Sequence, residues 1–137
     1  MTVRLLSLTS ALALAAGGAL AQDMSFNRIA SFAVAENTPD AEETSAEIIA
    51  ASGDGMTLIY TDSPAGVVGM IDIADPANPM PLGAVEMEGE PTSVATDDGT
   101  AAFIGVNTSA SYTEPSGFLM ALDMVTGAEA DRCDLGG

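Results

Sequence analysis

The side chains of this sequence that could do chemistry are almost all carboxylates. The chain of 137 residues has 20 Asp and Glu residues against 3 Lys and Arg residues, and it contains no His. The absence of His excludes a Ser-His-Asp triad and a histidine-ligated zinc site within this chain. Carboxylates can hold a hard cation such as Ca²⁺, and a strongly acidic surface also keeps a protein soluble in a salty medium. Solubility is the interpretation of the charge that we favour.

The charge balance also bears on the partners of the protein. Apart from Arg4 near the start, the only basic residues are Arg28 and Arg132. Binding to nucleic acid rests on Lys and Arg side chains that neutralise phosphates, and anionic membrane surfaces attract basic segments. The sequence therefore predicts no nucleic-acid partner and no attraction to an anionic membrane surface.

Cys133 is the only thiol in the sequence. A lone cysteine in a chain without His is a poor candidate for a catalytic nucleophile, because no neighbour that would activate it is evident. In an oxidising compartment, an unpaired cysteine indicates a second thiol elsewhere. We predict that Cys133 forms a disulfide with a partner outside this chain.

Residues 1–21 have the three parts of a cleavable secretory signal. A basic start at Arg4 is followed by an uncharged, Leu- and Ala-rich stretch that ends in Ala19-Leu20-Ala21. A membrane anchor would need about 20 strongly apolar residues, and here Ser, Thr and Gly dilute the stretch. The pattern predicts cleavage after Ala21, a periplasmic or secreted protein, and no membrane span after cleavage.

The segment that follows, residues 22–44, contains a stretch with apolar residues and then an acidic stretch. Phe26 to Val34 carries apolar residues at intervals and is predicted to form a first strand. An acidic stretch around Pro39 follows and is predicted to be a solvated loop, since it lacks the ordered carboxylate spacing of a known calcium loop.

From residue 45 onwards, short apolar stretches alternate with turn signals. Asp54-Gly55 and Asp98-Gly99 are typical of tight hairpin turns, because Asp-Gly supplies positive φ angles. Pro81 predicts an edge strand, because proline cannot donate to a sheet ladder. The strands are predicted at 48–51, 56–61, 67–73 and 81–87, and again at 93–96, 100–106, 118–124 and 129–135.

The two sets of strands are repeats of one another. Asp54-Gly55 aligns with Asp98-Gly99, an offset of 44 residues, and Leu58-Ile59-Tyr60 aligns with Ala102-Phe103-Ile104. Ile71-Asp72-Ile73 aligns with Leu122-Asp123-Met124 after a longer loop at 107–117. Units of about this length with four strands are typical of propeller blades.

We therefore predict an all-β fold with two propeller-type four-stranded antiparallel blades, at 45–90 and 91–137. The alternative is an ordinary sandwich with similar turns. Propellers typically close with about four to eight blades, so we expect an incomplete propeller: the front part of a longer protein, or a truncated one. Two unpaired blade faces would then be open to self-association.

Residues 43–137 also resemble a known family. These are exported bacterial β-propellers described by the phrase "esterase-like activity of phytase", some of them as alkaline phosphatases, and the stretch is similar to the repeats of surface-layer and choice-of-anchor propellers. The matching motifs are Ser45-Ala46-Glu47-Ile48, Ile59-Tyr60-Thr61-Asp62-Ser63-Pro64, Ile71-Asp72-Ile73-Ala74-Asp75-Pro76, Gly89-Glu90-Pro91-Thr92-Ser93-Val94, Gly105-Val106-Asn107-Thr108-Ser109 and Arg132-Cys133-Asp134-Leu135-Gly136-Gly137.

The resemblance implies Ca²⁺ at the top of a central channel, where metal and carboxylates bind phosphate. The candidate metal ligands in this chain are Asp62, Glu47 and Glu114, and Asp62 is the best of them. The alternative for Asp62, which we favour, is an aspartate that forms a turn by binding its own backbone. No catalytic residue is assigned, because a phosphate also needs Lys or Arg.

Two functions follow from these observations. In the first, the chain is the N-terminal fragment of an exported phytase-like propeller, the parent is a metal-dependent phosphoester hydrolase, and the fragment itself is inactive. In the second, it belongs to a non-catalytic extracytoplasmic propeller that binds a ligand or protein partner. Fold does not decide between the two, because one architecture supports many functions.

Overall fold

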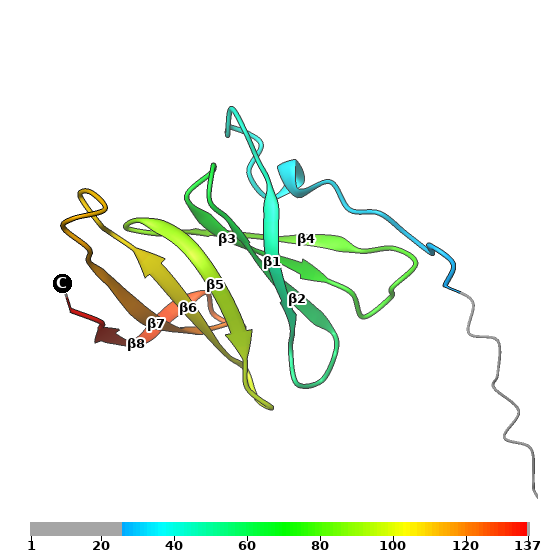
Figure 1. The fold of residues 1–137 in the computed structure, drawn as a ribbon. Helices are drawn as coiled ribbons and strands as arrows, with labels where there is room; N and C mark the ends of the chain where they lie inside the picture. The colour runs from blue at the N-terminus through cyan, green and yellow to red at the C-terminus, as the bar shows by residue number, and fades with distance from the viewer. Residues whose placement is uncertain (1–25, 137) are drawn as a thin grey trace, which may run out of the picture.

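The protein consists of two four-stranded antiparallel sheets, each with its strands in chain order (Figure 1). A computed structural model describes residues 26–136, so the predicted signal peptide and its cleavage site lie outside the described residues. Sheet 1 contains β1 (Ala46–Ala51), β2 (Thr57–Asp62), β3 (Val67–Asp72) and β4 (Met80–Glu86). Sheet 2 contains β5 (Glu90–Thr96), β6 (Ala101–Asn107), β7 (Gly117–Asp123) and β8 (Ala128–Asp134).

The prediction of an all-β chain with two four-stranded antiparallel sheets is confirmed. All eight predicted strands are present, with boundaries that differ by three residues or fewer. Pro81 stands in β4 at the edge of sheet 1, where its missing N–H leaves no gap in an interior ladder.

The turns show how short polar side chains set the strand ends. The connection between β1 and β2 spans residues 52–56 and is one residue longer than the turn predicted at 52–55. Gly55 supplies a φ of 71°, and the Asp54 carboxylate accepts hydrogen bonds of 2.6 and 2.9 Å that close the loop. In the equivalent turn Asp97 accepts two such bonds, at 2.8 and 3.1 Å, and Gly99 needs no positive φ.

The repeat seen in the sequence is also a repeat in register. Asp72 pairs with Thr57 at the end of β3, and Asp123 pairs with Ala101 at the end of β7. Each of these aspartates accepts a hydrogen bond from the backbone N–H two residues further on, at 2.8 and 2.9 Å. The two residues therefore do the same structural work, as the alignment predicts.

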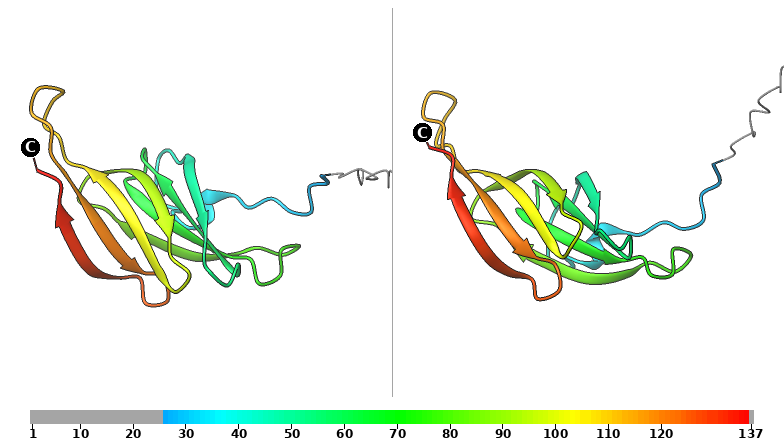
Figure 2. Two further views of the ribbon diagram at one scale, coloured as in Figure 1. Left: turned by 60° about the horizontal axis from the view of Figure 1, so that its bottom comes forward. Right: turned by 90° about the horizontal axis from the view of Figure 1, so that it is seen from below.

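The core lies between the two sheets, which stack face to face (Figure 2). Sheet 1 contributes Ile59, Val68 and Met70. Sheet 2 contributes alternate residues of β5, β6 and β7, which are Val94, Ala102, Ile104, Val106, Phe118, Met120 and Leu122. Burial of one Leu or Ile side chain stabilises a fold by about 1.5–3 kcal/mol, so burial of these residues stabilises the packing of the two sheets against each other.

The prediction of a first strand over residues 26–34 is wrong. Residues 26–33 form no ladder, and a single 3-10 turn, η1 (Val34–Glu36), follows them. The stretch around η1 lies against the side of sheet 1 that faces away from sheet 2, whereas the chain from residue 26 leads away from both sheets (Figure 2). It is held there by side-chain hydrogen bonds of Asn37 rather than by backbone pairing. Within residues 26–136 no helix has the length and apolar character needed to cross a membrane.

Candidate functional site

Asp62, the best metal candidate from the sequence, lies at the end of β2 and is completely buried. Its Oδ1 accepts hydrogen bonds from the backbone N–H groups of Ser45, at 2.9 Å, and Ala65, at 3.2 Å. The bond to Ala65 closes the turn between β2 and β3, as the turn-forming interpretation predicts. Its Oδ2 is buried and has no hydrogen-bond partner among the described residues.

Glu47 lies near Asp62 in the sheet and has a different set of contacts. Its Oε2 lies 2.5 Å from the Ser63 hydroxyl, which also lies 2.9 Å from the carbonyl oxygen of Pro91. A hydroxyl has one proton and can donate to only one of these two acceptors at a time. Ser63 therefore links β1 of sheet 1 to β5 of sheet 2, and Glu47 takes part in that link.

The third candidate, Glu114, lies at the exposed tip of the β6–β7 loop. Its backbone N–H donates to the carbonyl oxygen of Ser111 at 3.1 Å, so the loop closes on itself. Within residues 26–136 no three acidic, Cys or His side chains come together in a group that could hold a metal ion. The structure thus brings Glu47 and Asp62 to one end of sheet 1 and leaves Glu114 on a separate loop.

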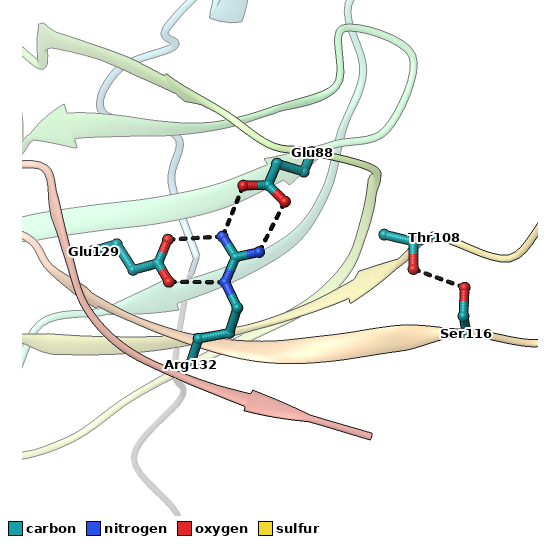
Figure 3. A network of polar contacts seen from close by, with 5 residues as sticks. All are labelled: Glu88, Thr108, Ser116, Glu129 and Arg132. Atoms are coloured by element: carbon teal, nitrogen blue, oxygen red, sulfur yellow. Dashed lines mark hydrogen bonds and ion pairs between the residues drawn. The ribbon is translucent and has the colours of Figure 1, made fainter. Parts of the chain in front are cut away.

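Arg132 is held by carboxylates (Figure 3). Its guanidinium donates to both carboxylate oxygens of Glu88, at 2.8 and 3.0 Å, and to both of Glu129, each at 2.8 Å. It also lies 4.0 Å from the centre of the Phe118 ring. These contacts join β8 to the segment between the sheets, and they occupy the donors that a phosphate would need.

The hydrogen bonds from Arg132 hold the pKa values of Glu88 and Glu129 below their usual range. A carboxyl whose pKa is lower in the folded state stabilises the fold above its unfolded pKa, and that stability is lost as the pH falls through the folded pKa. Replacing Arg132→Met is therefore expected to lower the melting temperature by a few degrees at pH 7, and by less below about pH 4. Melting curves followed by circular dichroism at both pH values test this.

The matched control for that experiment is Arg28→Met, which removes the same charge from the exposed N-terminal segment. We expect this control to melt like the unchanged protein at both pH values. An Arg132→Met variant with an equal deficit at low and neutral pH would contradict the electrostatic account of the cluster.

A groove of about 720 Å³ opens between the sheets at the end remote from Asp62. Its lining is mainly apolar, with Met56, Met70 and Met124 among the contributors, and it includes the carboxylates Asp54 and Asp72. Among residues 26–136 no Lys or Arg lines the groove, so its described lining offers no basic side chain that would balance the charge of a phosphate.

The face of sheet 2 that points away from sheet 1 has no partner in the described part of the chain. It carries Phe103 and Leu119, which are 39% and 37% exposed, between smaller residues. We call this the open face, and define it by Ser93, Ala95, Phe103, Gly105, Leu119, Ala121 and Asp131. Cys133, exposed and unpaired in the chain, lies beside it as the ladder partner of Leu119.

No family model matches the chain, and a search of curated proteins finds no match. The resemblance to exported propellers therefore stays a prediction. Sequence reasoning missed two features of the structure. One is Asn37, which carries no local signal. The other is the set of residues that forms the open face. The alignment of Ile59 with Phe103 is the sequence signal that could have found it.

Proposed function

We propose that this chain is a non-catalytic, exported module of propeller type that acts by binding through its sheet surfaces. The proposal is carried by the open face of sheet 2, where the apolar side chains of Phe103 and Leu119 are partly exposed and have no partner in residues 26–136. Apolar sheet faces of this kind are typical of association sites. Export rests on the predicted signal at residues 1–21.

The positions of the charged groups support binding over phosphoester hydrolysis. Asp62 accepts two backbone hydrogen bonds in a turn, Glu47 contacts Ser63, and Glu114 lies on a separate loop. Arg132 is occupied by two carboxylates. A hydrolytic site needs its groups held within about half an ångström of a productive geometry, and these residues converge on no common point.

The open face also supports the proposal that the protein self-associates. Cys133 lies on the exposed edge strand beside it, so a disulfide to a second molecule would lie at the border of the contact. Within this proposal the association is driven by burial of apolar surface. In an oxidising compartment the disulfide would stabilise the associated state further.

A hydrolysis assay and a calcium titration test the proposed function. We expect the purified chain to release no nitrophenol from 4-nitrophenyl phosphate above a heat-inactivated control, with or without millimolar Ca²⁺. We also expect Ca²⁺ to change the melting temperature no more than Mg²⁺ at equal ionic strength. Calcium-dependent turnover, or a calcium-specific rise in melting temperature that Asp62→Asn abolishes, would overturn the proposal.

A further inference from the structure

We infer that the groove between the two sheets binds an aromatic organic cation, whose ring packs on methionine side chains and whose ammonium group binds Asp54 and Asp72. The groove is a different surface from the open face, so the inference goes beyond the proposed function and does not depend on it. Three observations carry it: the size of the groove, its apolar lining, and the carboxylates at one of its ends.

The groove has the size of a small-molecule site. It lies between β3 and β4 of sheet 1 and the turn that follows β7 of sheet 2. Its volume of about 720 Å³ falls within the range of about 300–1,000 Å³ that is typical of ligand pockets. Stacked sheets lie about 10 Å apart, so a flat ring can enter between them where no side chain fills the space.

Three methionines from different elements form much of the apolar lining. Met70 of β3 and Met124 after β7 are buried and belong to the core, so the groove is continuous with the core. Met56, just before β2, is 54% exposed, which core packing does not explain. An unbranched thioether adapts its shape to a bound group and makes favourable contacts with aromatic rings. The lining therefore favours a ligand with an aromatic body.

Asp54 and Asp72 lie at the same end of sheet 1, because Asp72 pairs with Thr57 directly after the turn that holds Asp54. The Oδ1 atom of Asp54 accepts hydrogen bonds in that turn, at 2.6 and 2.9 Å. The Oδ1 atom of Asp72 accepts one from the Ala74 N–H at 2.8 Å. These hydrogen bonds engage only the Oδ1 atoms, which leaves the Oδ2 atoms to accept from an ammonium group and its three N–H donors.

Charge complementarity selects a cation as the occupant. Among residues 26–136, the charged side chains that line the groove are both carboxylates. Hydrogen bonds from the Ser52 hydroxyl and the Met56 N–H hold the pKa of Asp54 below its usual range, so this carboxyl is ionised at neutral pH. A neutral ligand would remove water from the carboxylates without replacing its hydrogen bonds, and an anion would be repelled.

Isothermal titration calorimetry at neutral pH with three probes of similar shape tests the inference: phenylbutylamine, phenylbutanol and phenylbutyrate. We expect phenylbutylamine to bind at one site per chain, about tenfold or more tightly than phenylbutanol, because charge-assisted hydrogen bonds are stronger than neutral ones. Phenylbutyrate is expected not to bind. The inference is wrong if the alcohol binds as tightly as the amine, or if the amine shows no saturable binding.

Asp72→Asn is expected to weaken binding of the amine about tenfold and to leave binding of the alcohol unchanged. Asp123→Asn is the matched control, because Asp123 holds the equivalent position in sheet 2, accepts the equivalent hydrogen bond at 2.9 Å and is not among the groove residues. Each variant removes one negative charge. An equal loss of affinity in both would show that net charge alone attracts the amine, and would refute the assigned site.

Met56→Ala tests the part of the groove assigned to the ring, and it replaces Asp72→Asn if circular dichroism shows that the latter does not fold. It is expected to weaken binding of both the amine and the alcohol severalfold. Ile49→Ala is the matched control, since it shortens a 57% exposed side chain on the far side of sheet 1. Unchanged amine binding by Met56→Ala would contradict the inference. The phosphate-ester assay tests the proposed function separately.

Discussion

Gly69→Ala is expected to destabilise the protein by about 3 kcal/mol. Gly69 lies directly opposite Tyr60 in the β2–β3 ladder, and a Cβ atom added there would overlap Cζ and Oη of the Tyr60 ring. The ring cannot move aside easily, because Tyr60 is completely buried and its hydroxyl is bonded to Asn37. Overpacking of this kind typically costs about 1–3 kcal/mol, and this site offers little room for relaxation.

Urea unfolding of the variant measures the effect as a lower midpoint. Gly99→Ala is the matched control, because its added Cβ would meet only the carboxylate of Asp97, at 3.3 Å in an exposed turn, and a change within about 0.5 kcal/mol is expected. Combining Gly69→Ala with Tyr60→Leu should recover part of the loss, since the two sites are in contact. A Gly69→Ala protein as stable as the unchanged one would show that the ring does not lie over this glycine.

Asn37→Ala is expected to destabilise the protein by about 2–4 kcal/mol. The substitution leaves the Gly83 N–H and the Met70 carbonyl oxygen without the partner that the Asn37 amide supplies. An unpaired buried polar group costs about 1–3 kcal/mol.

The same urea titration tests this prediction. Asn78→Ala is the control, because Asn78 is exposed and its side chain bonds only to Asp75 in a surface turn. Tyr60→Phe provides a milder variant, since it removes the hydroxyl that Asn37 contacts and leaves the other two bonds in place. An Asn37→Ala protein as stable as the unchanged one would contradict the role given to the Asn37 hydrogen bonds.

The strands and their order could be predicted because their causes are local. Asp and Gly residues at the turns favour chain reversal whatever the rest of the chain does, and Pro81 cannot stand inside a sheet. The alignment predicted that Asp72 and Asp123 hold equivalent positions, because each accepts a hydrogen bond from the backbone N–H two residues further on. The failed strand at 26–34 shows the limit, since its apolar residues did not reveal whether a ladder partner existed.

The amino-acid sequence by itself determined the eight strands, the two sheets and the acidic, histidine-free chemistry of this protein. Only the tertiary structure decided which polar side chains meet. Asn37 reaches Gly83 across 46 positions, and Arg132 reaches Glu88 across 44, and neither pair shares a local pattern. The physical reason is the separation along the sequence over which each effect acts, because turn and strand preferences act between neighbours in the chain. Partners for a buried amide or a guanidinium appear only once the sheets have stacked and twisted into place.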